Sequence, residues 1–258
     1  MIKMENGDKN KQYILSSVET ALSVLELYFD HEELSAAEVA KYLKISRSTA
    51  FRFLVTLESK SYLKKTENSK YRLGIKLFAL GQVANRRMEL ISLVHPYLER
   101  LTEFTGETSH FTCMDGDSYV AFLDHVLGTK HLHMNMMLGT RRVAHTTASG
   151  KVMLAYGAAQ QITKYLKNIS FIQQTENSIK DAKQLLEELE EIKEIGYGCD
   201  NEEAEVGLSC YAVPLLNAEG MPVAAISISG PTTRLIANKE SYLKKLEEAA
   251  GEIMSALK

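Results

Sequence analysis

Residues 34–63 read LSAAEVAKYLKISRSTAFRFLVTLESKSYL, and this stretch predicts two short helices separated by a tight turn. Ser35 and Glu38 form a capping box at the start of the first helix. Lys44 and Ile45 leave room only for a turn, after which Ser46 caps the second helix. Each helix carries one apolar face, made of Val39, Ala40 and Leu43 in the first and of Ala50, Phe53, Leu54 and Leu57 in the second. Two such helices in succession are typical of a helix-turn-helix.

The flanking segments extend this unit on both sides. Ser16 and Glu19 offer a further capping box, and apolar residues at helical spacing predict a helix that runs to about Phe29. Downstream, residues 62–65 and 70–73 read as two short strands around a polar turn. The apolar face expected for the upstream helix consists of Val18, Ala21, Leu22, Leu25, Tyr28 and Phe29. A helix-turn-helix followed by a β-hairpin predicts a winged helix-turn-helix domain.

The polar side of the second helix is the first candidate functional surface. Arg47, Ser48, Thr49 and Arg52 lie in its opening turns, away from the apolar face and next to the cap Ser46. In a helix-turn-helix these positions meet base edges in the major groove, where Arg can bridge the O6 and N7 atoms of a guanine. The hairpin adds cations that would lie beside phosphates, namely Lys64, Lys65, Lys70 and Arg72. The alternative is a solvated polar face on which Ser46 is a simple helix cap.

The charge distribution points the same way. From Lys41 to Lys76 there are 10 basic and 2 acidic residues, a net charge of +8, whereas the whole chain carries −3. Residues 77–258 hold 17 Lys or Arg and 23 Asp or Glu. A basic segment on an acidic protein suggests a polyanion site, because clustered cations displace counterions from phosphates. The competing explanation is a solvated face that happens to be basic.

Length and composition limit the class of protein. The 258 residues suffice for one large or two small domains, and the 45% apolar and 24% charged content is ordinary for a soluble globular chain. No apolar run approaches 18 residues, and the first 13 residues lack the features of a secretory signal. The three cysteines have no CxxC spacing, so we expect reduced thiols in a cytoplasmic protein.

Helical patterns continue into the middle of the chain. An apolar segment follows Gly74, and residues 88–104 carry a second apolar face that Pro96 interrupts. Such a face either packs against a partner subunit or covers its own second domain. We expect four segments: a flexible N-terminal segment at 1–15, the winged helix-turn-helix domain at 16–75, a linker helix at 76–90 and a second domain at 91–258.

The second domain changes to a pattern of short strands and helices. Strands are expected at 108–114, 118–124, 130–136, 209–216 and 221–229. Helices are expected in TTASGKVMLAY at 146–156, in a less clear stretch after it, at 178–195 and at 239–257. Antiparallel strands flanked by helices predict an α+β fold.

These segments together resemble the IclR (isocitrate lyase regulator) family of bacterial transcription regulators, from about Ser17 to the C-terminus. The matching stretches are SSVETALSVLEL, residues 34–63, YRLGIKLFALG, HTTASGKVMLA, GYGCDNEEAEVGLSCYAVPLL and MPVAAISISGP. The YRLG at 71–74 is characteristic of that family, and Ser61 departs from it because the family usually has Gly there. The resemblance implies a C-terminal effector-binding domain with a GAF-like fold. It also implies a homodimer or homotetramer on a pseudo-palindromic DNA operator, with repression favoured over activation.

The resemblance also implies an effector site in the second domain. Matched position by position, its residues are Ala148, Ser149, Gly150, Asp200, Cys210, Ser227 and Ser229, and an ungapped reading back from Gly150 adds His131 and Met134. Free N–H groups at a helix start suit a small carboxylate. Asp200 would repel one unless it is protonated or bonded to a ligand hydroxyl. Leu132, Met134, Met136 and Met137 could instead line an apolar pocket for an aromatic acid, although core methionines and backbone-bonded strand hydroxyls are the commoner outcome.

Rival functions find less support in the sequence. There is no phosphate-binding P-loop, no G-x-S-x-G elbow and no HExxH, and we expect no cofactor and no metal. A zinc site would need Cys113, Cys210 and a histidine, and His131 and His133 point to opposite faces if they lie on a strand. Asp200, Glu202 and Glu203 could be an acid/base group of an enzyme acting on a small acid, or part of a solvated loop. A ligand-binding scaffold that never reads DNA is the third hypothesis.

Overall fold

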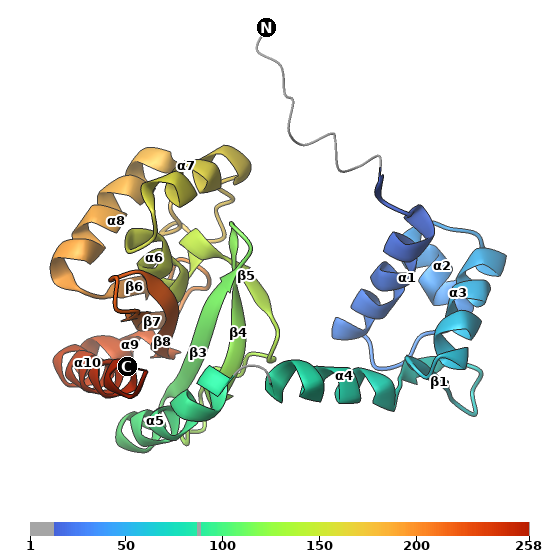
Figure 1. Cartoon of the computed structure of the whole chain (residues 1–258), viewed down its shortest axis with the longest axis horizontal. Coiled ribbons are helices and arrows are strands. Elements are labelled where there is room, and N and C mark those ends of the chain that lie inside the picture. Colours follow the sequence, from blue (N-terminus) through green and yellow to red (C-terminus); the bar gives the residue numbers. More distant parts are fainter. Residues whose placement is uncertain (1–12, 87–88, 258) are drawn as a thin grey trace, which may run out of the picture. The chain divides into compact units, whose positions relative to one another are not determined.

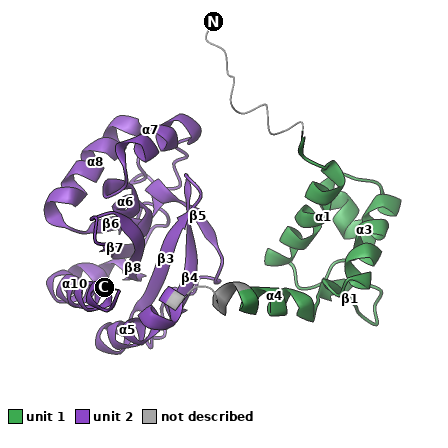
Figure 2. Ribbon diagram, viewed as in Figure 1, with its two compact units in different colours: residues 1–87 green, residues 88–258 purple. Residues whose placement is uncertain are grey.

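Two units divide the chain, residues 1–87 and residues 88–258 (Figure 2). The computed structural model describes residues 13–86 and 89–257. The expected flexible segment at 1–15 falls almost wholly outside the described residues. The boundary between the two units lies inside the segment expected to be a linker helix.

The first unit is the predicted winged helix-turn-helix. Its elements are α1 (Ser16–Glu26), a 3-10 turn (Leu27–Phe29), α2 (Ala36–Leu43), α3 (Arg47–Ser59), β1 (Leu63–Lys65), β2 (Tyr71–Leu73) and α4 (Ile75–Arg86). The capping box of α2 forms both bonds, Ser35 N–H to Glu38 Oε2 at 2.7 Å and Glu38 N–H to Ser35 Oγ at 3.3 Å. Lys44 turns the chain in the left-handed region with φ 53°, and Ser46 then caps α3 by accepting the Thr49 N–H at 3.1 Å.

The orientation of α1 corrects two expectations. Leu15 is the N-cap and makes no side-chain cap bond, so the capping box expected of Ser16 and Glu19 is wrong. Val24 is the residue that α1 buries, whereas Val18 and Leu22 are 52% and 55% exposed. The expected apolar face was therefore partly misplaced, because it included the exposed Val18 and Leu22 and left out the buried Val24.

The turn before the wing is held in an uncommon backbone conformation. Ser61 has φ 64°, in the left-handed region that favours glycine. Gly74 closes against this turn, since a Cβ added to it would lie 2.3 Å from the Ser61 carbonyl oxygen. The close approach explains why a glycine is needed at position 74, where the hairpin ends. The positive φ means that glycine would fit position 61 better than Ser61 does.

The second unit is an α+β domain built on a six-stranded antiparallel sheet (Figure 1). The strand order is β5-β4-β3-β8-β7-β6. The strands are β3 (Thr108–Asp115), β4 (Tyr119–Val126), β5 (Arg141–Val143), β6 (Gly198–Asn201), β7 (Leu208–Leu216) and β8 (Pro222–Pro231). The helices are α5 (Glu89–Thr105), α6 (Ala148–Ala155), α7 (Ala159–Asn168), α8 (Ala182–Ile195), α9 (Thr232–Ala237) and α10 (Lys239–Ala256), and a 3-10 turn spans Ala144–Thr146.

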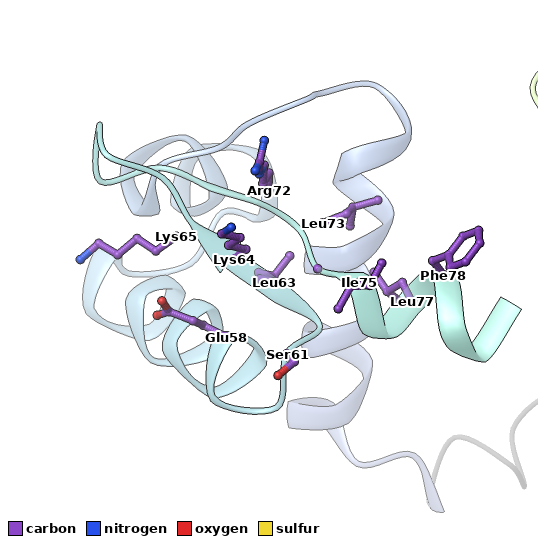
Figure 3. Close-up of a pocket in the computed structure, with 11 residues that line it drawn as sticks. Glu58, Ser61, Leu63, Lys64, Lys65, Arg72, Leu73, Ile75, Leu77 and Phe78 are labelled. Atoms are coloured by element: carbon purple, nitrogen blue, oxygen red, sulfur yellow. The ribbon is translucent and has the colours of Figure 1, made fainter. Parts of the chain in front are cut away.

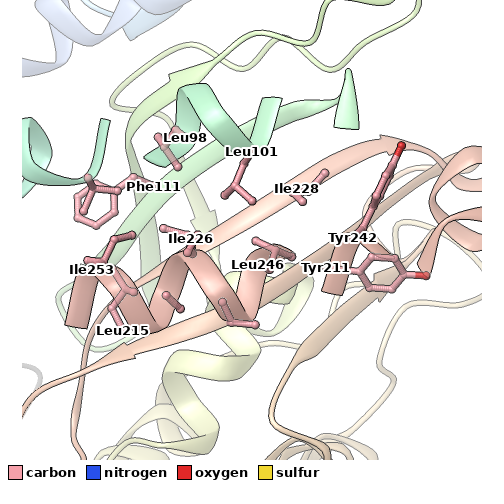
Figure 4. Packing of buried hydrophobic residues seen from close by; sticks show 14 of the residues in the cluster. Leu98, Leu101, Phe111, Tyr211, Leu215, Ile226, Ile228, Tyr242, Leu246 and Ile253 are labelled. Carbon is pink, nitrogen blue, oxygen red and sulfur yellow. The ribbon is translucent and has the colours of Figure 1, made fainter. Parts of the chain in front are cut away.

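Alternate residues of the sheet point into two hydrophobic cores, one on each face. Phe111, Ile226 and Ile228 point to the face covered by α5 and α10, where Figure 4 shows them packed against Leu98 and Leu246. The opposite face carries a second core under α6, α7 and α8, which includes Val120, Phe122, Ala148, Leu185 and Ala225. Side chains that alternate along β8 thus belong alternately to the two cores.

Several boundaries in the second unit differ from expectation. Residues 130–136 form a loop instead of a strand, since side chains bond its carbonyls: Arg234 Nη2 bonds the Leu132 oxygen at 2.6 Å and Thr108 Oγ1 bonds the Met134 oxygen at 2.6 Å. The short strands β5 and β6 and the helix α9 were not expected, and α8 begins at Ala182 behind its N-cap Asp181.

Candidate functional site

The exposed side of α3 presents the predicted recognition residues. Arg47, Ser48 and Arg52 are exposed and Thr49 is half-buried. The Ser46 hydroxyl lies 2.9 Å from Ser48 Oγ and 2.8 Å from Thr49 Oγ1, besides capping the helix. The two arginines are therefore the side chains of this surface whose donors are free to bridge base edges, while the hydroxyls satisfy one another.

The wing carries a basic edge beside α3. Figure 3 shows Lys64, Lys65 and Arg72 extending from the hairpin, at a cleft of about 940 Å³. Lys70 differs from these three, because its Nζ lies 3.5 Å from the Glu38 carboxylate. The backbone bond from Ser35 and the Lys70 ammonium together lower the pKa of Glu38. The Lys70 charge is thus partly compensated within the protein, which its position in the sequence did not reveal.

A second candidate site is a cavity of about 60 Å³ in the second unit, between the sheet and the start of α6. Residues from the sheet, from α6 and from two loops line it: His110, Phe122, Met134, Met136, Arg142, Thr147, Ala148, Ser149, Asp200, Ala204, Glu205, Leu208, Cys210, Ser227 and Ser229. The lining mixes apolar residues, such as Phe122, Met134 and Met136, with polar ones, such as Ser149, Asp200 and Ser227.

Two buried polar atoms of this cavity have no partner within the described residues. His110 Nε2 lies 2.8 Å from Ser229 Oγ, but His110 Nδ1 and Ser227 Oγ make no hydrogen bond there. Burial, aided by the nearby His125, lowers the pKa of His110 to about 3, so the ring is neutral at physiological pH. Unpaired buried polar atoms are costly, and a polar ligand would satisfy both of these.

The start of α6 adds backbone donors. Thr147 is its N-cap and accepts the Gly150 N–H at 3.0 Å. The amides of Ala148 and Ser149 precede the first intrahelical bonds, and both residues line the cavity. Donors at the positive end of a helix favour an anion.

Asp200 brings a carboxyl group to the same cavity. It is buried and accepts the Glu203 N–H at 2.8 Å. Burial raises the pKa of Asp200 despite that bond and the nearby Lys151. A raised pKa makes Asp200 easier to protonate, and a protonated carboxyl can donate a hydrogen bond to a ligand.

Each of the two units matches a known protein family. Residues 17–67 match the IclR helix-turn-helix domain, and residues 82–255 match the C-terminal domain of bacterial IclR transcriptional regulators. The chain belongs to the IclR family of bacterial transcriptional regulators. It is 34% identical to the transcriptional regulator KdgR of Escherichia coli over 257 residues, which covers 98% of this chain and 97% of KdgR.

Solved structures agree with this fold. The crystal structure of the Thermotoga maritima IclR matches with a TM-score of 0.78 and 33% identity, over 94% of this chain and 98% of that one. An IclR homologue from Microbacterium hydrocarbonoxydans, complexed with 4-hydroxybenzoate, matches with a TM-score of 0.81 at 22% identity, over 93% and 98% of the two chains. This IclR-family protein is a transcriptional regulator with a helix-turn-helix DNA-binding domain and a C-terminal effector domain. No helix of the described chain is long and apolar enough to span a membrane.

The effector residues expected in this IclR-family regulator fall into two groups. Seven of them line the cavity: Met134, Ala148, Ser149, Asp200, Cys210, Ser227 and Ser229. Gly150 does not, because it packs inside the fold where a Cβ would lie 2.1 Å from the Ala144 oxygen. His131 is exposed on the loop and does not line the cavity either, and Leu132 and Met137 are also exposed.

Other lining residues of the regulator were not anticipated. These are His110, Phe122, Arg142, Thr147, Ala204, Glu205 and Leu208, whereas Met136 lines the cavity as the apolar-pocket alternative expected. Strand alternation could have located His110, which shares a face with Thr112 and opposes Phe111. Nothing in the sequence signals Arg142, because β5 has only three residues and lies after a loop whose path depends on distant side chains.

A buried ion cluster holds the loop that follows Asp200. Lys151 on α6 is fully buried, and its Nζ bonds Glu203 Oε1 at 2.5 Å and also the Glu188 carboxylate on α8. Burial raises the pKa of Glu203 to about 7, against the attraction of Lys151. Asp200 and Glu203 are both buried, so the alternative of a solvated loop is wrong for these two residues. Among the residues described, no three His, Cys, Asp or Glu side chains gather as metal ligands would.

Proposed function

We propose that this protein is an operator-binding regulator whose DNA affinity is set by a small carboxylate or aromatic acid bound in the cavity beside α6. The observation that carries the proposal is the cavity itself. It joins the free amides of Ala148 and Ser149 to two unpaired buried atoms, His110 Nδ1 and Ser227 Oγ. The cavity would bind the effector, and the exposed basic residues of α3 would bind DNA.

On DNA, α3 enters the major groove and the wing follows the phosphate backbone. Arg47 and Arg52 make base contacts, with Ser46, Ser48 and Thr49 beside them. Lys64, Lys65, Lys70 and Arg72 contact phosphates and position the domain without reading sequence. Replacing Arg52 with Ala costs roughly 1–3 kcal/mol and relaxes base preference, whereas Lys70→Ala weakens binding to all sequences alike.

The regulator acts as a dimer or tetramer on a pseudo-palindromic operator. Apolar side chains exposed on the first unit support self-association, among them Val18, Leu22, Ile75 and Phe78. Two half-sites read by a dimer are expected about one helical turn apart, on the order of 34 Å. Relatives that act as repressors favour repression over activation.

Ligand size links the cavity to the regulatory response. A volume of about 60 Å³ is room for a few water molecules. An aromatic acid needs more room, so it enters only if the loops that carry Met136 and Glu205 move outward. Such a ligand changes DNA binding only if it prefers one arrangement of the protein over another.

An enzyme acting on a small acid has one observation in its favour. The His110–Ser229 contact of 2.8 Å resembles a base beside a nucleophile. However, no carboxylate orients His110 in the described structure, and a pKa of about 3 makes the ring a weak base at neutral pH. The relatives are transcriptional regulators, so the regulator is the better-supported function.

Fluorescence anisotropy on duplexes selected from a random pool tests the proposal. Titrations at several salt concentrations, with and without small carboxylic and aromatic acids, should give tight and salt-dependent binding that one acid shifts. The variant Arg52→Ala should lose sequence preference on the same duplexes. Absence of selective binding under every condition would remove the proposed function and leave the cavity as the remaining lead for an enzyme.

A further inference from the structure

Arg142 is the only lysine or arginine among the described residues that line the cavity. Its guanidinium has no carboxylate within 4 Å in the described chain, although Glu205 and Asp200 line the same cavity. The neighbouring Arg141 is different: its Nε lies 2.5 Å from Asp115 Oδ2, and its guanidinium stacks on Tyr119 at 4.5 Å. Two adjacent arginines therefore have separate surroundings, one engaged by the protein and one unengaged.

Strand register explains the separation. Arg142 pairs with Val120 across β4 and β5, and Arg141 pairs with Ala121. Partners in an antiparallel pair share a face, and adjacent residues point to opposite faces. Val120 belongs to the core under α6, so Arg142 stands on the face that holds the start of α6.

We propose that Arg142 makes this cavity select an anionic ligand, with its guanidinium and the Ala148 and Ser149 amides holding the carboxylate while Ser227 and His110 meet a polar group at the ligand's other end. This inference rests on the proposed function, because it names the group that recognises the effector. Arg142 is thus a specificity-determining residue that the family resemblance did not supply.

The other charges around the cavity permit an anion there. Asp200 is buried, its Oδ1 accepts the Glu203 N–H, and burial raises its pKa. His110 is neutral, because burial lowers its pKa to about 3. The Lys151 ammonium is paired with the carboxylates of Glu203 and Glu188. Arg142 and Glu205 are both exposed residues of the cavity lining, and no ion pair joins them in the described chain. Arg142 is therefore the unpaired cation of the lining, on the same face as the positive start of α6.

The test compares acids with their uncharged amides. The probes are acetate, pyruvate, lactate, benzoate and 4-hydroxybenzoate, each beside its amide, titrated into the full chain and followed through the backbone amide resonances of Ala148 and Ser149. The variants are Arg142→Gln and Arg142→Lys, with Arg141→Gln as the matched control from the same strand.

The expected result is a saturable shift with at least one acid, stronger than with its amide. Loss of a charge-assisted pair should weaken the acid about tenfold or more in Arg142→Gln, and leave the amide within about twofold. Arg142→Lys should recover part of the loss, because it keeps the charge without the planar fork. Arg141→Gln should change neither ligand.

Two outcomes would overturn the inference. One is equal acid affinity in wild type and Arg142→Gln. The other is saturation by amides but by no acid. Equal acid affinity in the two proteins overturns the inference alone, because an acid can still shift operator binding. Saturation by amides but by no acid overturns the inference together with the acid effector of the proposed function, whereas selective operator binding is tested separately.

Discussion

Removal of the buried ammonium of Lys151 should destabilise the second unit strongly. In Lys151→Met the thioether replaces most of the packing, but the Glu203 carboxylate, with 8% of its side chain exposed, loses its counter-charge. Removing one partner of a buried ion pair costs about 3–5 kcal/mol. Because Glu188 is 26% exposed and can be rehydrated, the loss should lie near the lower end, about 3 kcal/mol.

The loss should also depend on pH, because the folded pKa of Glu203 is raised to about 7 from an ordinary value of 4.5. A carboxyl with a raised folded pKa binds a proton more readily in the folded than in the unfolded protein. The free energy of unfolding therefore falls as pH rises through that window. Without the Lys151 charge the folded pKa of Glu203 rises further, so this fall in the free energy of unfolding becomes steeper. The stability lost in Lys151→Met should therefore be largest at pH 8 and smaller at pH 5.5, where Glu203 is protonated.

Urea unfolding followed by circular dichroism measures the free energy, and hydrogen exchange of α6 and β7 peptides assigns it to the second unit. A loss of about 3 kcal/mol corresponds to a melting temperature lower by roughly 6–12 °C. The control is Lys183→Met, whose 3.6 Å pair with Glu187 is 85% and 67% exposed and should matter by less than about 0.5 kcal/mol. A loss below about 1 kcal/mol, or one independent of pH, would refute the reasoning.

Three further predictions concern single residues. Ser61→Gly should stabilise the first unit by about 0.5–1 kcal/mol in thermal unfolding, because φ 64° strains a serine, and a destabilised variant would contradict this. Lys65→Ala should weaken DNA binding and lower the salt slope more than Lys70→Ala, since Lys70 lies 3.5 Å from Glu38; equal effects in anisotropy titrations would count against that pairing. His110 has a folded pKa of about 3, so the unfolded chain binds its proton first and stability falls as pH drops below 6.5. Between pH 7.5 and 5.5, the free energy of unfolding measured in urea should therefore fall by about 1 kcal/mol less in His110→Gln than in wild type. An unchanged pH slope would speak against the buried neutral ring.

Local signals predicted the first unit well. The capping box of Ser35 and Glu38 and the cap at Ser46 depend on residues within one helical turn, so the sequence contains the whole interaction. The wing followed from two short strands around a polar turn. The second unit's α+β class followed similarly from strand and helix periods, and most of the family-matched cavity residues lie together in space.

Interactions between distant residues were not predictable. The loop at 130–136 has the alternation of a strand, but Arg234 and Thr108 bond its carbonyls from other parts of the chain. Lys151 appears in the sequence as one lysine at a helix start, and its burial depends on Glu203, 52 residues later. The choice of inward face for α1 likewise depends on packing against α2 and α3, which the helical period does not specify.

As a regulator, the protein must couple ligand binding in the cavity to DNA binding by the first unit. The most direct test measures the acid's affinity for the free protein and for the protein saturated with its selected duplex, and the duplex affinity with and without the acid. Thermodynamic linkage requires both ratios to be equal, and we expect a factor of about 5 or more. Equal ratios above that factor would establish the coupling, whereas ratios of one, with both ligands bound, would contradict the account.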